Sequence, residues 1–263
     1  MKNPINLFVL CLIGSGSSYA AVSMIPASGW NYDTIHNGSG PYATGVSATM
    51  NGGLGQPEGY TWVEAGTYLN PSGELQAIPG FVAGINTSLT GNGTFSFQPF
   101  DGNNTIALDG GQSAILTLDT AASYSQLALF GASGFGAKTA SVSLNFTDST
   151  STEFLVASGT GIGTDWFNNN ADKAVVAGAS ASNRSEDGNL SLFLNEDTSI
   201  GINESLFSLS ATDQLKSLQS VTITNTGGDR MMVFAISGDA VPEPTSAAML
   251  GLGGLALMLR RRK

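Results

Sequence analysis

Hydrophobic and polar residues alternate along several segments in the second half of the chain. The clearest segment is 141–147, where Val142, Leu144 and Phe146 are separated by Ser, Asn and Thr. Because successive side chains of a strand point to opposite faces, this period of two predicts strands with one buried and one polar face. Other segments with this pattern are 114–119, 190–194 and 221–224. Short alternating strands separated by turn signals favour an all-β fold, an antiparallel β-sandwich or jelly roll.

Other segments complete this picture of a β-rich chain. Residues 127–130 form a continuous apolar run, which is typical of a buried strand, and 231–236 predict a final strand after a turn at 225–229. Residues 21–90 are rich in Asn-Gly, Gly-Gly and Gly-Pro turn signals, so we expect loops and short strands there. Only 213–218 has the pattern of a helical turn.

The first 20 residues have the features of a secretory signal peptide. Lys2 provides a positive start, 7–14 are apolar, and Ser18-Tyr19-Ala20 is a small-x-small cleavage site. We therefore expect a short signal helix and cleavage between Ala20 and Ala21. The single cysteine, Cys11, would leave with this peptide, so the mature protein would have no disulfide and no cysteine metal site.

The last 23 residues have three parts with separate physical roles. The first is the extended strip Val241-Pro242-Glu243-Pro244, in which each proline disfavours a helix. The second, 245–259, is uncharged and predicts a short apolar helix, below the roughly 20 residues that span a bilayer comfortably. The third is the basic end Arg260-Arg261-Arg262-Lys263, which resists translocation and acts as a stop-transfer signal.

This arrangement resembles the PEP-CTERM sorting signal of exported proteins in Gram-negative bacteria. The resemblance covers 241–263 and implies recognition by exosortase, a membrane-embedded transpeptidase, and passage through the inner membrane to the cell envelope or extracellular matrix. It also implies bacteria that make extracellular polysaccharide. The sequence therefore divides into a signal peptide over 1–20, a β-sandwich ectodomain over 21–240 and a sorting signal over 241–263. The alternative is an ordinary tail anchor.

Removal of both signals changes the charge of the protein. The whole chain has 10 basic and 20 acidic residues, whereas 21–241 keep 5 basic and 19 acidic residues, a net charge of −14. Such a surface repels nucleic acid and anionic lipid, so nucleic acid is not an expected partner. It suits neutral glycans, cationic partners or divalent cations, or it simply keeps the protein soluble.

The body of the chain also resembles galactose-binding-like β-sandwich domains of exported bacterial proteins. The residues that carry this resemblance are Phe97 to Asn104, the strand pair between Ser113 and Phe146, and Asp165-Trp166-Phe167. Related domains have Asp-Gly after the strand that ends at Phe146, where this chain has Asp148-Ser149. This fold hosts many roles, so it implies no single function.

Few residues suggest chemistry. His36 is the only histidine, so we expect neither a His-based catalytic triad nor a His-rich metal site, and we expect His36 at the surface. Glu58, Glu64 and Asp165 could form a glycosidase pair, but no spacing selects two of them. The sequence therefore favours a protein that is not an enzyme.

Two binding sites can be suggested. Asp101, Asn103, Asn104 and Asp109 are oxygen ligands within one short segment and could hold a structural Ca²⁺, although Asx-turns explain the same residues without a metal. Trp166 and Trp62 could stack on sugar rings, and the alternative for both is a place in the hydrophobic core.

The sequence predicts an exported envelope or matrix protein with a structural or adhesive role and no catalytic activity. The first alternative is a carbohydrate-binding module for extracellular polysaccharide, and the second is a glycan-active hydrolase.

Overall fold

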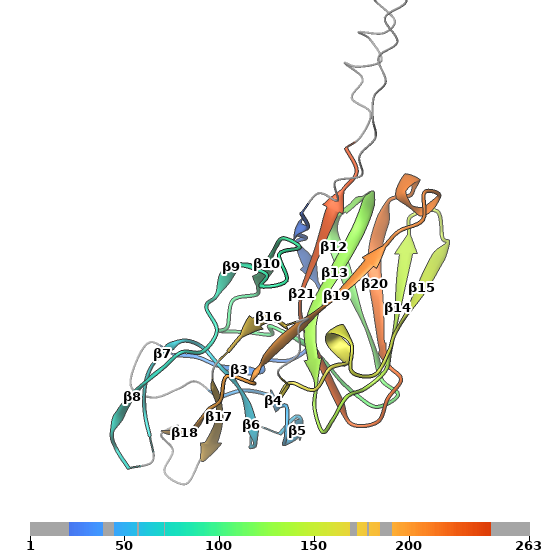
Figure 1. Ribbon diagram of the computed structural model, residues 1–263. Coiled ribbons are helices and arrows are strands. Elements are labelled where there is room, and N and C mark those ends of the chain that lie inside the picture. Colours follow the sequence, from blue (N-terminus) through green and yellow to red (C-terminus); the bar gives the residue numbers. More distant parts are fainter. Residues whose placement is uncertain are drawn as a thin grey trace, which may run out of the picture.

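The computed structural model describes residues 21–38, 45–56, 58–70, 72–168, 173–177, 179–184 and 191–242. Within these ranges the protein consists almost entirely of β-strands, arranged as two packed antiparallel sheets with smaller sheets beside them (Figure 1). The predicted β-sandwich is therefore confirmed. The expected signal helix and the expected apolar tail helix lie outside the described residues.

One of the two packed sheets, the central sheet, has the order β1-β21-β13-β19-β16, and β11 also pairs with β21. Its strands are β1 (Ser23–Met24), β11 (Ile106–Asp109), β13 (Tyr124–Ser133), β16 (Lys173–Val176), β19 (Gly201–Ser208) and β21 (Arg230–Ala240). The other, the outer sheet, has the order β15-β14-β20-β12-β2. Its strands are β2 (Ala27–Ser28), β12 (Ser113–Ala122), β14 (Ala140–Phe146), β15 (Ser151–Val156) and β20 (Leu218–Asn225).

The remaining strands are short and form four small sheets. They are β3 (Ile35–His36), β4 (Ala48–Thr49), β5 (Gly53–Leu54), β6 (Tyr60–Val63), β7 (Gly66–Leu69), β8 (Leu75–Ile78), β9 (Gly84–Thr87), β10 (Thr94–Phe97), β17 (Ala179–Arg184) and β18 (Ser191–Glu196). The small sheets are β18-β17-β6-β3, β10-β9, β4-β5 and β7-β8. Two 3₁₀ turns are η1 (Gly161–Gly163) and η2 (Asp213–Leu215). The prediction of short strands in the first part and of a helical turn near residue 213 is confirmed.

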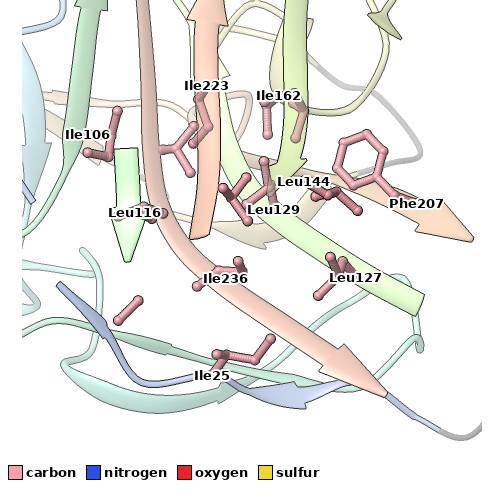
Figure 2. Packing of buried hydrophobic residues seen from close by; sticks show 14 of the residues in the cluster. Ile25, Ile106, Leu116, Leu127, Leu129, Leu144, Ile162, Phe207, Ile223 and Ile236 are labelled. Carbon is pink, nitrogen blue, oxygen red and sulfur yellow. The ribbon is translucent and has the colours of Figure 1, made fainter. Parts of the chain in front are cut away.

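The first hydrophobic core lies between the central and outer sheets. Figure 2 shows Leu129 and Ile236 of the central sheet close to Leu116, Leu144 and Ile223 of the outer sheet. Each of these side chains is buried. Along β12, β14 and β20, the residues that alternate with the buried ones face away from the core. This arrangement explains the period of two that the sequence shows in β12, β14 and β20.

A second core covers the opposite face of the central sheet. Phe130 and Phe234 of that sheet pack there with Trp62, Phe81 and Phe95, which come from the first part of the chain. The central strands β13 and β21 are therefore buried on both faces, which requires apolar residues at successive positions. The continuous apolar runs at 127–130 and 231–236 have this physical cause.

The two ends of the described chain lie side by side. Ser23 and Met24 of β1 pair with Gly238 and Ser237 at the end of β21. The chain leaves β21 at one end of the sandwich, where the backbone amide of Val241 donates a hydrogen bond to the carbonyl of Ser123 at 2.8 Å (Figure 1). The first and the last described residues thus lie at the same end of the folded body.

Candidate functional site

A groove lies where the edge of the outer sheet meets the central sheet. It has a volume of about 580 Å³ and lies between β15, β19 and the turn that joins β9 to β10. The groove exists because β15 is the last strand of its sheet, so nothing continues the sandwich beyond it. The residues that line it are Thr90, Asn92, Phe154, Leu155, Val156, Thr160, Gly161, Glu204, Ser205, Leu206 and Phe207.

One wall of the groove is apolar. The rings of Phe154 and Phe207 have centroids 5.3 Å apart and are tilted by 53°. Leu155 at the rim is 80% exposed, which is unusual for a leucine in a strand. These side chains offer a hydrophobic surface at the edge of the sandwich that is large enough for a small ring.

The other wall is polar and centres on the buried carboxylate of Glu204. Its Oε2 accepts hydrogen bonds from the hydroxyls of Ser88 at 2.6 Å and Thr90 at 2.5 Å, and its Oε1 accepts one from Nδ2 of Asn92 at 3.0 Å. A buried carboxylate needs such donors, because its removal from water is costly. These bonds fasten the turn after β9 to β19, so Glu204 holds the polar wall in place.

The loop that leads into η1, with Thr160 and Gly161, completes the groove. Gly161 has a positive φ of 46°, and a Cβ there would lie 2.0 Å from Oγ of Ser205. The same Oγ accepts a hydrogen bond from the backbone amide of Ile162 at 2.9 Å. A glycine at 161 therefore allows η1 to approach β19 closely.

The structure places the two predicted sugar-stacking tryptophans in the second core. Trp62 is 0% and Trp166 is 2% exposed, and their ring centroids are 4.9 Å apart in an edge arrangement. In this conformation neither ring face is open to a sugar. The neighbouring Phe167 is 37% exposed and is the aromatic residue of this segment that reaches the surface.

The predicted calcium ligands have separate partners. Asp109 accepts two hydrogen bonds from Arg230, at 2.8 and 3.0 Å, and Nδ2 of Asn103 donates to the carbonyl of Trp30 at 3.3 Å. Asp101 is exposed. Among the residues that the structure describes, no three His, Cys, Asp or Glu side chains come together as a metal-binding group.

A polar cluster that the sequence did not predict lies around Asn104. The buried side chain of Asn104 donates to Asp33 at 2.8 Å, and its Oδ1 accepts hydrogen bonds from the hydroxyls of Thr34 and Thr105. Burial raises the pKa of Asp33 to about 6, the bond from Asn104 opposes this rise, and the charge of Asp101 adds to it. The Asn-Asn pair in the sequence was the available signal, but its partner is 71 residues away.

His36 is the clearest correction. We expected a surface residue, but His36 is buried in β3 beside β6, where it is the parallel partner of Val63. The Gly-rich and Asn-rich sequence around it hid a short buried strand, because a strand of two residues gives no periodic signal.

Comparison with protein families identifies the end of the chain. Residues 240–263 match the PEP-CTERM protein-sorting motif. The chain is an exported protein that carries an exosortase sorting signal. It passes through the membrane to the cell envelope. No curated protein matches the chain.

The matched residues lie mostly outside the described part. Val241 and Pro242 are described and leave the end of β21, whereas Glu243, Pro244 and the basic end are not. Among the described residues no helix has the length and apolar character needed to cross a membrane. The predicted cleavage site at Ala20 and Ala21 is described only from Ala21 onward.

Proposed function

We propose that the exported protein is a non-catalytic structural or adhesive component of the cell envelope or extracellular matrix. The observation that carries this proposal is the state of Glu204. It is the sole carboxylate among the described residues that line the groove, and its three hydrogen bonds come from uncharged donors. Hydrolysis of a glycosidic bond typically uses two carboxylates on opposite sides of that bond. Glu204 has the contacts of a structural residue.

The arrangement of the chain ends adds support. Because β1 and β21 bring both ends to one end of the sandwich, the sheet faces and the groove are not occupied by the attachment of the export signals. A body held or released at one end can contact other matrix components with the rest of its surface.

A second candidate function is that of a carbohydrate-binding module. The observation that favours it is the groove with one apolar and one polar wall, since sugars present both CH faces and hydroxyl groups. Thr90, Asn92 and Thr160 provide polar contacts opposite Phe154 and Phe207. Extracellular polysaccharide is the partner expected for this candidate.

The adhesive role can be tested in the producing strain. We expect a strain that lacks this gene to show weaker cell-to-cell adhesion and less retained matrix, both restored by the wild-type gene. Purified protein incubated with the matrix polysaccharide should release no new reducing ends. New reducing ends that disappear with Glu204→Gln would instead establish a hydrolase, and unchanged adhesion in the deletion strain would contradict the adhesive role.

Sorting can be tested separately. Replacement of Pro242, Glu243 and Pro244 by alanine should leave an unprocessed form in the membrane fraction, because exosortase recognises this strip. The matched control is Thr245→Ala, directly outside the motif, which should be processed normally. Immunoblots of membrane and culture fractions measure both. Normal processing of the triple variant would show that another segment directs sorting.

A further inference from the structure

The outward face of the outer sheet carries three rows of side chains that run across its strands. These residues, the hydroxyl face, lie opposite the first core and on the side of the sandwich away from the small sheets (Figure 1). The first row is Leu155, Ser141, Thr224 and Ser113. The second row is Glu153, Ser143, Thr222 and Ile115. The third row is Ser151, Asn145, Ser220, Thr117 and Ser28.

The composition of this face is unusual for a solvated sheet. Nine of its thirteen residues are Ser or Thr and one is Asn, while Glu153 is the single charged residue and none is basic. Hydroxyl and amide groups offer hydrogen bonds without charge, so the chemistry of this face favours contact with an uncharged polar partner.

The hydroxyls are held in order by hydrogen bonds within and between the rows. Ser113 and Thr224 lie 2.7 Å apart, and Nδ2 of Asn145 donates to Ser220 at 3.2 Å and to Thr222 at 3.0 Å. The hydroxyl of Ser141 donates to Glu153. Each hydroxyl has one donor and two acceptor positions, so these bonds leave acceptor capacity directed at the surface. Ser141 is buried, and the other twelve residues of the face are half-buried or exposed.

We propose that the hydroxyl face binds a neutral polysaccharide chain laid across the strands. This inference rests on the proposed adhesive function and identifies the hydroxyl face as the surface that makes the adhesive contact. A neutral polysaccharide offers alternating hydroxyls and CH groups, which match the hydroxyl rows and the exposed Ile115 and Leu155. Two of the rows cross four strands and the third crosses five, with strands spaced about 4.8 Å apart, so they provide a repeated set of donors and acceptors that suits a polymer.

Charge decides between this ligand and others. The expected mature body, 21–241, has 5 basic and 19 acidic residues, so an anionic polysaccharide is repelled by its overall field. A second copy of the chain carries the same negative charge and offers no complementary basic patch on this face. Leu155 also lies at the rim of the groove, so a bound chain can continue from the face toward Phe154.

The test uses the full-length protein in mild detergent and affinity electrophoresis in gels that contain dextran, hydroxyethyl cellulose or alginate. We expect retardation by at least one of the neutral polymers and none by alginate. Thr222→Lys, at the centre of the face, should weaken retention about tenfold or more, a loss of roughly 1.4 kcal/mol. Thr222→Val keeps the shape and removes the hydroxyl, and should weaken it to a lesser degree.

The matched control is Thr67→Lys, which places the same charge at an exposed position of β7, in a small sheet away from the hydroxyl face, and should leave retention unchanged. Circular dichroism and thermal unfolding confirm that each variant folds. Retention equal to wild type in a folded Thr222→Lys variant would overturn the proposal, as would an equal loss of retention in Thr67→Lys. Absence of retention by both neutral polymers would also overturn the proposal. The adhesive function is tested separately, by the adhesion of the strain that lacks the gene. If Thr222→Lys changed the sedimentation coefficient of the protein but not its retention, the face would mediate self-association, and the proposal would be overturned too.

Discussion

At the scale of single residues, Asp33 is the side chain whose environment departs most from that of its free form. Its carboxyl group is half-buried beside Asn104, and burial raises its pKa to about 6 from an ordinary 3.8. Between these two pH values the folded state binds more protons than the unfolded state. The stability that Asp33 contributes therefore falls as the pH rises through this window.

We expect Asp33→Asn to stabilise the protein at pH 7 and to make no difference near pH 3.5. The asparagine keeps an oxygen for the bond from Asn104 and carries no charge to bury. The gain at pH 7 should be about 1–2 kcal/mol, since one pKa unit corresponds to about 1.4 kcal/mol and water partly screens a half-exposed carboxylate. Urea unfolding at several pH values measures it. Asp119→Asn, at an exposed position, is the control, and an equal gain in that variant would show that net charge alone is responsible.

Ser149 is the second residue with a local cost. It has φ of 66° in the turn between β14 and β15, a region that favours glycine. Ser149→Gly should raise the free energy of unfolding by about 0.5–1 kcal/mol, because relief of a left-handed conformation outweighs the greater freedom of glycine in the unfolded chain. Ser151→Gly, within β15, should lower it by a similar amount. Destabilisation by both changes would mean that the turn is not strained. Urea denaturation measures both.

At the scale of elements, Arg230 joins two parts of the chain. It lies at the start of β21, binds Asp109 at the end of β11, and donates Nη1 to the carbonyls of Thr49 and Met50, each at 2.8 Å. Thr49 ends the short strand β4 and Met50 follows it in the turn to β5, so these bonds hold the short β4-β5 hairpin against the sandwich.

Arg230→Met should therefore lower the free energy of unfolding by roughly 2–4 kcal/mol, because the buried carbonyls of Thr49 and Met50 lose their donor. Loss of the ion pair adds little, since the side chain of Asp109 is exposed. Lys138→Met is the control, because Asp229, its partner, has an exposed side chain and such pairs contribute up to about 1 kcal/mol. Chemical denaturation compares the two variants. Similar losses of unfolding free energy in both variants would show that Arg230 contributes no more than an ordinary surface ion pair.

The same scale shows what the sequence could predict. Val142, Leu144 and Phe146 alternate because the outer sheet has one buried face, and the apolar run at 127–130 reflects a strand covered on both sides. Both patterns are local and were predicted. The bonds from Ser88 to Glu204 and from Asn104 to Asp33 join residues 116 and 71 positions apart. Local periodicity carries no information on such pairings.

At the scale of the whole molecule, the sorting motif begins where the last described strand ends. The sequence predicted this motif because its signal is linear, whereas a groove or a sheet face depends on the fold. The last pairing of β21 is that of Ala240 with Tyr124, and Val241 adds one hydrogen bond to Ser123. Among the described residues, the strand pairing of the sandwich therefore ends at about the point where the motif begins.

A chain cut after Pro242 should therefore unfold at the same temperature as the full-length protein, within about 2 °C, a shift that corresponds to less than roughly 1 kcal/mol for a protein of this size. A chain that ends at Phe234 loses the pairs of Ile236 and Ser237 with β13 and of Ser237 and Gly238 with β1, and it also exposes the first core. We expect that variant not to fold. Differential scanning calorimetry compares the three chains. A clear loss of stability on removal of 243–263 would mean that the tail also supports the body and acts as more than an address.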